Sequence, residues 1–255
     1  MIRVEGLSKS FDGAIVLHDL DLAVNDGETL VIIGRSGGGK SVLVKHLCGL
    51  LKPDAGQVWV DDTDIVPLSE DELAPIRKKF GVLFQGAALF DSLTVFDNVA
   101  FPLREERAHT EQEIEERVMR ALQIVDLAKA RDKKPAELSG GMRKRAGLAR
   151  ACVAAPKYIL YDEPTTGLDP MRADNINHLI LRLRDELKVT GVAVTHDMVS
   201  AYKIADRIAM LHEGRIYTVG TAQEIQSSPD PVVRRFVAGI GDFSQEVQLG
   251  QATVR

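Results

Sequence analysis

A glycine-rich segment that ends in a lysine and a serine is the stretch best suited to chemistry. Residues 34–41 read GRSGGGKS and fit the phosphate-loop pattern G-x-x-x-x-G-K-[ST] at every fixed position. The apolar run 30–33 before it predicts a buried strand, and residues 42–47 after it predict a helix. Glycines let backbone N–H groups point at phosphate oxygens, and the helix N-terminus adds partial positive charge. We therefore predict a nucleoside triphosphate site in which Lys40 reaches the β- and γ-phosphates and Ser41 ligates Mg²⁺.

Two adjacent carboxylates follow the apolar run 158–161. Asp162 closes that run and Glu163 comes next. Because the carboxyl end of a parallel strand faces the ligand crevice, Asp162 is placed to help hold Mg²⁺ and Glu163 to polarise an attacking water. Taken alone, the pair is equally explained by an ordinary strand end. Together with the phosphate loop, it indicates nucleotide hydrolysis.

A third motif, Ser139-Gly140-Gly141, precedes an apolar helical pattern. Ser139 can cap the helix, and the two glycines leave backbone N–H groups open to an anion. In isolation, this motif is better explained as a serine–glycine turn that caps a helix.

The elements that must position these residues predict an α/β fold. Short β-rich runs from residue 2 to residue 24, broken by Asp12-Gly13, predict antiparallel strands. Continuous apolar runs at 158–161 and 192–195 flank a predicted helix at 171–188 and predict strands buried in a parallel sheet. Further strands are expected at 57–60 and 81–85, a hairpin at 208–217, and a short helix capped by Thr221.

The middle of the chain predicts a mostly helical lobe from about residue 87 to residue 155. Thr94 and Thr110 each begin a sequence typical of a capping box, and apolar residues recur at helical spacing after the second. These apolar residues are Ile114, Val118, Leu122 and Val125. We expect residues 1–240 to form one domain that contains this lobe, and residues 241–255 to form a polar tail.

Composition narrows the class of protein. The 255 residues carry a formal net charge of -5, which argues against a general nucleic-acid binder. No run of about 18 apolar residues is present, and the first residues lack the features of a signal peptide. Cys48 and Cys152 lie in apolar helical patterns, so we expect reduced core cysteines rather than a disulfide or a metal site.

Together, the motifs resemble those of the ATP-binding subunits of ATP-binding-cassette (ABC) transporters. The matching segments are Gly34–Ser41, Gln85, Leu138–Gly141, Tyr158–Glu163, Gly167–Asp169 and His196, in the order and spacing of that family. The resemblance implies a P-loop NTPase fold, with a RecA-like core, an antiparallel β subdomain and a helical subdomain that carries the signature motif. It implies ATP hydrolysis coupled to transport, with ATP and Mg²⁺ as cofactors.

The resemblance also implies a role for each matching position. Catalytic roles fall to Glu163, His196, Gln85 and Lys40. Metal contacts fall to Ser41, Gln85 and Asp162. Nucleotide contacts fall to Phe11, Gly34, Arg35, Ser36, Gly37, Gly38, Gly39, Lys40, Ser41, Ser139, Gly140, Gly141 and Asp169. The lesser alternative for Phe11 is a core aromatic, and by residue type alone a histidine after a strand is more often structural than catalytic.

Two segments depart from the common family pattern. Met142 stands where most members have Gln, and Val42 stands where Thr is common. Residues 142–145 (MRKR) and 85–90 (QGAALF) resemble one bacterial subgroup, the ATPases that work with MCE-domain lipid-binding proteins, including the Mla system for outer-membrane lipid asymmetry. The simplest alternative for Arg143, Lys144 and Arg145 is a solvated helix face.

The resemblance implies a set of partners and a location. The signature of one copy completes the nucleotide site of another, so a homodimer is expected, together with an integral-membrane permease that docks near residues 87–101. An MCE-domain protein and a small cytosolic regulator are further candidates, and nucleic acid is not. The expected location is peripheral, at the cytoplasmic face of the bacterial inner membrane, and the expected cargo is phospholipid.

Three alternatives remain open. The first is the ATPase of an importer or exporter for another substrate. A soluble ABC protein that acts on ribosomes or DNA is less consistent with a single cassette and with the short segment between residues 86 and 138. A different P-loop enzyme, such as a kinase or GTPase, leaves Ser139 and His196 unexplained.

Overall fold

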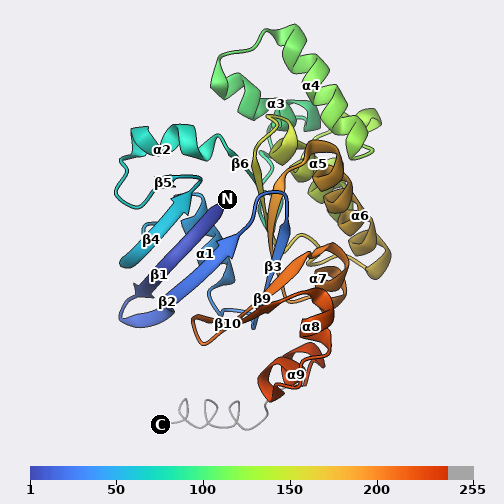
Figure 1. Cartoon of the computed structure of the whole chain (residues 1–255). Coiled ribbons are helices and arrows are strands. Elements are labelled where there is room, and N and C mark those ends of the chain that lie inside the picture. Colours follow the sequence, from blue (N-terminus) through green and yellow to red (C-terminus); the bar gives the residue numbers. More distant parts are fainter. Residues whose placement is uncertain (241–255) are drawn as a thin grey trace, which may run out of the picture.

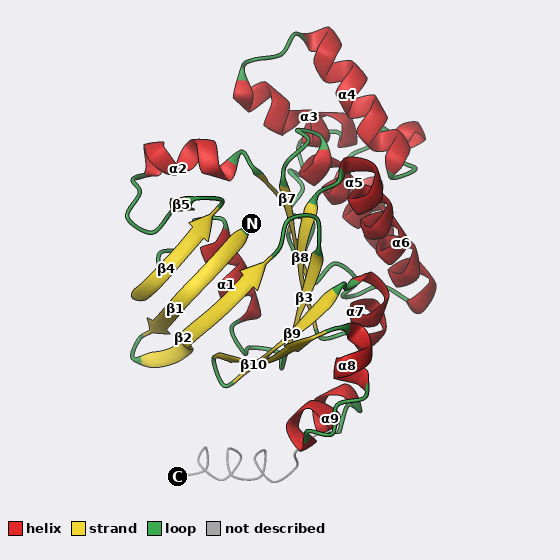
Figure 2. Ribbon diagram, viewed as in Figure 1, coloured by secondary structure: helices red, strands yellow, loops and turns green. Residues whose placement is uncertain are grey.

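The computed structural model describes residues 1–240, and the expectations for the tail at 241–255 lie outside the described residues. Two β-sheets lie side by side, and helices cover the larger one (Figures 1 and 2). The smaller sheet is antiparallel with strand order β2-β1-β4-β5. Its strands are β1 (Ile2–Phe11), β2 (Ala14–Val24), β4 (Ala55–Val60) and β5 (Thr63–Asp64). The antiparallel strands predicted for residues 2–24 are confirmed.

The larger sheet contains six strands within residues 1–240, in the order β10-β9-β3-β8-β7-β6. All neighbours pair in parallel except β10 and β9, which form the predicted hairpin. The strands are β3 (Thr29–Ile33), β6 (Phe80–Leu83), β7 (Tyr158–Asp162), β8 (Thr190–Thr195), β9 (Arg207–His212) and β10 (Arg215–Gly220). Since the carboxyl ends of parallel strands meet at one edge, the residues that follow β3, β6, β7 and β8 gather there.

The larger sheet separates two hydrophobic cores. Along β3, Val31 and Ile33 pack into the core shared with most of the helices, whereas Leu30 and Ile32 pack against the antiparallel sheet and α1 (Lys40–Leu47). Every residue of β3 and β8 is buried, which is why these strands read as continuous apolar runs instead of alternating ones.

A helical lobe lies beyond the β6 edge of the larger sheet (Figure 1). It contains α3 (Val95–Glu106), α4 (Glu111–Ile124) and α5 (Gly140–Cys152), joined by short 3₁₀ turns at Ala128–Ala130 and Pro135–Glu137. Thr110 makes a complete capping box, and Thr94 accepts a hydrogen bond from the Asp97 amide at 3.1 Å. The apolar residues predicted to share one face of α4 are buried, as expected.

The remaining helices pack on the sheets. They are α2 (Glu70–Arg77), α6 (Pro170–Leu187), α7 (Met198–Ile204), α8 (Ala222–Gln226) and α9 (Pro231–Val237). Of these, α6 and α8 were predicted, whereas α7 and α9 were not. Helix α2 was also missed, although Ser69 and Glu72 form a full capping box, because Pro75 inside the helix weakens its pattern. No helix within residues 1–240 is long and apolar enough to cross a membrane.

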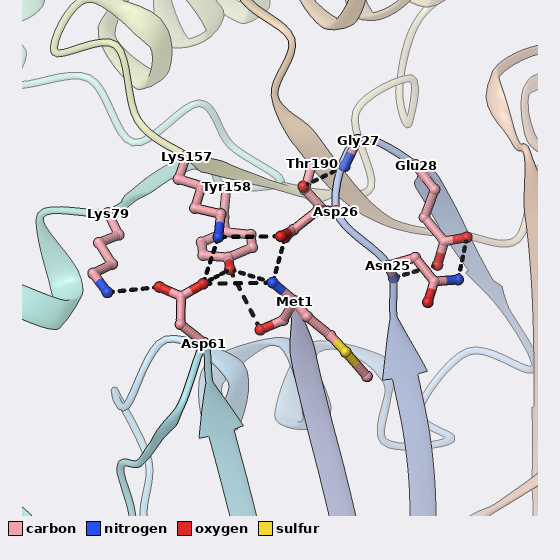
Figure 3. A network of polar contacts seen from close by, with 10 residues as sticks. All are labelled: Met1, Asn25, Asp26, Gly27, Glu28, Asp61, Lys79, Lys157, Tyr158 and Thr190. Atoms are coloured by element: carbon pink, nitrogen blue, oxygen red, sulfur yellow. Dashed lines mark hydrogen bonds and ion pairs between the residues drawn. The ribbon is translucent and has the colours of Figure 1, made fainter.

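A polar network joins the antiparallel sheet to the start of β7 (Figure 3). The Asp61 carboxylate, just beyond β4, accepts hydrogen bonds from Lys79, Lys157 and the Tyr158 hydroxyl. Burial opposes the ionisation of Asp61, but these hydrogen bonds outweigh it and lower the pKa of its carboxyl group. Because these donors come from separate segments, Asp61 fixes the two sheets relative to each other at this end.

Candidate functional site: a nucleotide cavity

The phosphate loop connects β3 to α1 by a path that only glycine can follow at two positions. A Cβ on Gly34 would lie 2.4 Å from the Leu211 carbonyl oxygen. Gly39, the N-cap of α1, has a left-handed φ of 95°, and a Cβ there would approach the Leu17 side chain to 2.9 Å. The loop therefore lies close to β9 and β2. The N-terminus of α1 lies at the edge of the larger sheet where the parallel strands end.

Lys40 is buried at the start of α1, with 5% of its surface exposed. Its Nζ donates to the carbonyl oxygens of Gly34 at 2.8 Å and Arg35 at 3.0 Å, and it lies 3.9 Å from Oε1 of Glu163. Burial lowers the pKa of Lys40, and the carboxylates of Glu163 and Asp162 oppose that shift. The ammonium thus lies between the loop backbone and the acidic pair, where phosphate oxygens would give it further partners.

The acidic pair at the end of β7 contacts two other predicted residues. Ser41 Oγ donates to Asp162 Oδ1 at 2.8 Å, so two of the three predicted metal ligands are in contact. Glu163 is buried and has a left-handed φ of 50°. Its Oε1 lies 3.0 Å from Nδ1 of His196, and its Oε2 accepts a hydrogen bond from Thr166 Oγ1 at 2.8 Å. Sequence reasoning missed Thr166, because a lone threonine in a loop carries no chemical signal.

Lys40, Ser41, Glu163 and His196 line an open cavity of about 360 Å³, and Asp162 and Thr166 are not among its lining residues. Phe11, at the end of β1, and Gln85, two residues beyond β6, complete it. The strand predicted at 81–85 ends at Leu83, which leaves Gln85 in the turn that follows it. The lining residues that were predicted are Phe11, Ser36, Gly37, Gly39, Lys40, Ser41, Gln85, Glu163 and His196. Arg35 and Gly38 instead line a neighbouring cavity beside the β9–β10 hairpin and α9.

Besides Gly34, Arg35 and Gly38, four predicted nucleotide-binding residues on α5 and α6 lie outside this cavity. Ser139 caps α5 by accepting from the Met142 amide at 3.3 Å, and Gly140 and Gly141 form the first turn of that helix. Asp169 caps α6 and accepts from the Arg172 amide at 3.0 Å. Ser139 and Gly141 line a separate cavity of about 530 Å³ between α5 and α6. One chain therefore does not bring its own signature motif to its own phosphate loop.

Of the three basic residues after the signature motif, Arg143 is exposed and Arg145 is half-buried, whereas Lys144 is not part of a solvated helix face. Lys144 is buried, and its Nζ donates to the carbonyl oxygens of Gln85 and Glu163. Arg143 donates to the Leu138 carbonyl at 2.7 Å, and Arg145 donates to the carbonyl of Asp126 at 3.1 Å. The solvated-face interpretation is therefore wrong for Lys144, because α5 packs this residue against the segments that follow β6 and β7.

Comparisons with known proteins agree with this geometry. The family model for the ABC transporter matches residues 17–166. A probable ribonucleotide transport ATP-binding protein of Mycobacterium leprae is 44% identical over 255 residues, which cover 99% of this chain and 74% of that protein. A methionine import ATP-binding protein of Carboxydothermus hydrogenoformans is 40% identical over 241 residues, covering 93% of this chain and 71% of that protein.

Two solved structures share the fold. A dimeric ATP-binding cassette in a post-hydrolysis state, bound to ADP and Pi, matches with a TM-score of 0.81 and 32% identity, covering 87% of this chain and 99% of that one. The cbiO1 protein of Clostridium perfringens, part of an ABC transporter complex, matches with a TM-score of 0.82 and 29% identity over 98% of both chains. The predicted P-loop NTPase fold is confirmed.

The fold and the cavity define a nucleotide-hydrolysing cassette. The chain belongs to the ABC transporter family. Within that family it is an ATP-binding subunit, and it is an ATPase.

Cys48 and Cys152, the two cysteines of the chain, are buried and free, as expected for core residues. Burial raises the pKa of both thiols, for Cys152 to about 12, so neither is a reactive thiolate at neutral pH.

Proposed function

We propose that the chain hydrolyses ATP as a dimer, with each signature motif acting on the nucleotide held by the other copy. The observation that carries this proposal is the separation of Ser139 and Gly141 from the phosphate-loop cavity of their own chain. That cavity is open on one side, and a capped helix N-terminus with two glycines is suited to contact a phosphate from outside. A second copy supplies such a helix.

In the proposed reaction, the residues of the cavity position ATP and a water molecule. Lys40 and the loop amides hold the β- and γ-phosphates, and Phe11 offers its ring to the adenine. Glu163 polarises the attacking water, His196 contacts the γ-phosphate and keeps Glu163 oriented, and Gln85 lies beside the water. Asp169 connects the two sites of the dimer.

The oxygen atoms at the end of β7 fit a magnesium ion. Ser41 Oγ and Asp162 Oδ1 are hard oxygen ligands 2.8 Å apart, and Mg²⁺ in phosphate sites takes one or two protein oxygens besides phosphate and water. Gln85 would add an amide oxygen from the cavity wall. Bound there, Mg²⁺ neutralises charge that develops on the phosphates.

Dimer formation tests the proposal directly. The Glu163→Gln variant, mixed with Mg-ATP, is expected to elute at the mass of a dimer in size-exclusion chromatography with light scattering. The same variant with Mg-ADP, and Ser139→Arg combined with Glu163→Gln in Mg-ATP, are the controls and should stay monomeric. A variant that stays monomeric in saturating Mg-ATP would contradict the dimer.

We further propose that the dimer energises phospholipid transport with an MCE-type system at the cytoplasmic face of the bacterial inner membrane. Supporting this cargo is the likeness of residues 142–145 and 85–90 to the ATPases of that subgroup. The partners are an integral-membrane permease that docks near residues 87–101, an MCE-domain lipid-binding protein and a small cytosolic regulator. Phe90 and Phe101 on this segment are exposed, and their ring centroids lie 4.8 Å apart in a tilted pair that offers the permease an apolar contact.

A second candidate is import of a small molecule. The relatives named for methionine and spermidine/putrescine import are 40% and 39% identical to this chain, against 44% for the relative named for ribonucleotide transport. These sequence identities are too similar to favour one cargo, so the identity of the permease must distinguish the candidates.

Affinity purification from detergent-solubilised membranes, followed by mass spectrometry, separates the two candidates. Recovery of a multi-pass permease with an MCE-domain protein, and ATPase activity of that complex stimulated by phospholipid, is expected for lipid transport. A permease that co-purifies with an amino-acid or polyamine receptor instead would overturn the lipid proposal and favour import.

A further inference from the structure

The helix that begins at the signature motif carries a buried lysine that the reaction described above does not use. Lys144 lies on α5 and has 5% of its surface exposed. Its Nζ donates to the backbone oxygen of Gln85 and, at 2.9 Å, to that of Glu163. These two residues come from separate segments, one beyond β6 and the other beyond β7. A single ammonium therefore connects α5 to both.

The backbone of Glu163 needs such a contact. Its φ of 50° is unfavourable for a residue other than glycine, and such a conformation persists only where the surroundings hold it. The Glu163 amide donates to the Val194 carbonyl at 3.0 Å, and Thr166 and His196 hold the carboxylate. Lys144 donates to the carbonyl, the remaining polar group of this residue, at 2.9 Å, and the Thr166 amide donates to the same oxygen at 3.4 Å. Without that bond, the peptide following Glu163 loses a restraint at the point where the carboxylate must face the γ-phosphate.

The charge of Lys144 also indicates a role beyond packing. Burial lowers the pKa of Lys144, while the carboxylates of Asp162 and Glu163 oppose that shift. A methionine would fill a similar volume without the desolvation of an ammonium. The lysine is therefore explained by what its N–H groups hold rather than by the space it fills.

A second side chain of α5 shows how far the contact extends. Arg150 donates to the carbonyls of Ala88 and Ala87, each at 2.7 Å, so α5 holds the segment after Gln85 at further points. Of these two cations, only Lys144 also reaches Glu163. It is the one that relates α5 to the catalytic carboxylate.

We propose that Lys144 is a positioning residue that keeps Glu163 and Gln85 in the arrangement needed for hydrolysis and relates it to the position of the signature helix. Ser139, five residues earlier, caps the same helix, so a nucleotide on the partner copy that engages Ser139 acts on the element that holds Glu163. Contact of the partner's ATP with Ser139 thereby affects the position of Glu163 in the same copy. This inference rests on the roles proposed above for Glu163 and for the signature motif.

Three substitutions in the full chain test the role. Lys144→Met removes the N–H groups at similar volume, Lys144→Gln keeps two donors without the charge, and Arg143→Met is the matched control on the same helix. Steady-state ATPase assays give kcat and KM, and a fluorescent ATP analogue gives the nucleotide affinity of the isolated chain. We expect kcat to fall about 20-fold or more in Lys144→Met and less in Lys144→Gln. The analogue affinity should stay within about twofold of the parent, and Arg143→Met should keep kcat within about twofold.

Comparison with Glu163→Gln distinguishes this inference from the proposed function. If Lys144 acts through Glu163, adding Lys144→Met to Glu163→Gln should lower the residual rate no further. Loss of activity in Glu163→Gln with a normal kcat in Lys144→Met overturns the inference and leaves the proposed function standing. Normal turnover in Glu163→Gln overturns the proposed function itself. A parallel loss of kcat, nucleotide affinity and melting temperature in both Lys144 variants would show a merely structural lysine and would also overturn the inference.

Discussion

Glu163 is the residue at which the interactions of the site converge. Its carboxylate contacts His196 and Thr166, its amide and carbonyl bond to Val194 and Lys144, and Lys40 lies 3.9 Å from Oε1. A buried carboxylate with this many partners has one orientation, which suits a group that must align a water molecule with a phosphate.

Replacing Glu163 by Gln keeps the shape and the Thr166 contact but removes the proton acceptor. We expect kcat to fall about 100-fold or more, because general-base groups contribute about 10²–10⁴-fold. ATP affinity should stay within about threefold, as measured by equilibrium binding of labelled nucleotide. Glu116→Gln, at an exposed position of α4, is the control and should leave both values unchanged. Ordinary turnover in Glu163→Gln would assign the water to another residue.

His46 gives the fold a dependence on pH. It is buried in α1, its Nδ1 lies 2.7 Å from the Val42 carbonyl, and Nε2 has no hydrogen-bond partner among the described residues. Burial lowers the pKa of His46 below 6.5. Below about pH 6.5 the unfolded state binds a proton that the native state does not, so stability falls as the pH falls, by at most about 1.4 kcal/mol per pH unit.

Urea unfolding at a series of pH values between 7.5 and 5.5 measures this effect. The free energy of unfolding should fall toward pH 5.5 in the parent chain and fall less steeply in His46→Leu. His18→Gln, at an exposed position, should keep the slope of the parent. Equal slopes in the parent and His46→Leu would remove His46 as the cause.

Much of the site could be predicted residue by residue because its chemistry is local in sequence. The phosphate loop, Asp162 and Glu163 can be recognised by their residue types at fixed spacing next to apolar strands. Lys144 could not be found in this way. A lysine on a helix is ordinarily solvated, and only the packing of α5 against the turns after β6 and β7 shows that this one is buried.

At the scale of elements, α5 packs directly against β6. A Cβ on Gly81, within β6, would lie 1.9 Å from the carbonyl oxygen of Ala151 at the end of α5. The helix therefore rests directly on the strand that leads to Gln85. This contact keeps the signature helix and the Gln85 turn at a fixed separation.

Gly81→Ala is expected to destabilise the protein by about 3 kcal/mol or more, since backbone atoms must separate to admit the methyl group. Gly86→Ala, five residues later, is a matched control, because no atom lies within 4 Å of its Cβ position and the change should stay within about 0.5 kcal/mol. Chemical denaturation of both variants measures the difference. Equal stability would mean that α5 can shift away from β6 without loss.

Elements were predictable where their patterns are long or strongly apolar. The buried strands β3, β7 and β8 and the capped helix α4 followed from residue type and spacing. In contrast, α2 was missed, since a proline inside eight residues outweighed its capping box. The strand at 81–85 was drawn too long because Phe84 is apolar, although the chain turns after Leu83.

At the scale of the whole molecule, the proposed function requires two copies to complete each site. Ser139→Arg places a long cation at an exposed helix start that the proposed dimer buries against ATP. We expect ATPase activity to fall about 50-fold or more while labelled nucleotide binds the single chain within about twofold of the parent affinity. Ser69→Arg removes the analogous cap of α2, at a cost of about 1 kcal/mol, and should leave activity intact. Full activity in Ser139→Arg would contradict the shared site.

The polar network at Asp61 fixes the orientation of the antiparallel sheet, which carries Phe11, the proposed adenine contact, at its far end. Two strands diverge from it, because β1 runs from Met1, whose carbonyl accepts from the Asp61 amide, to Phe11, and β7 runs from Tyr158 to Asp162. Ten residues of β1 span about 33 Å, so a rotation of the antiparallel sheet by about 2° displaces Phe11 by about 1 Å.

Asp61→Ala should therefore raise the KM for ATP severalfold and leave kcat nearly unchanged in steady-state assays, whereas an unaltered KM would mean that the sheet is held elsewhere. Asp61, far from the proposed nucleotide site, would then control the affinity for the adenine base at a distance.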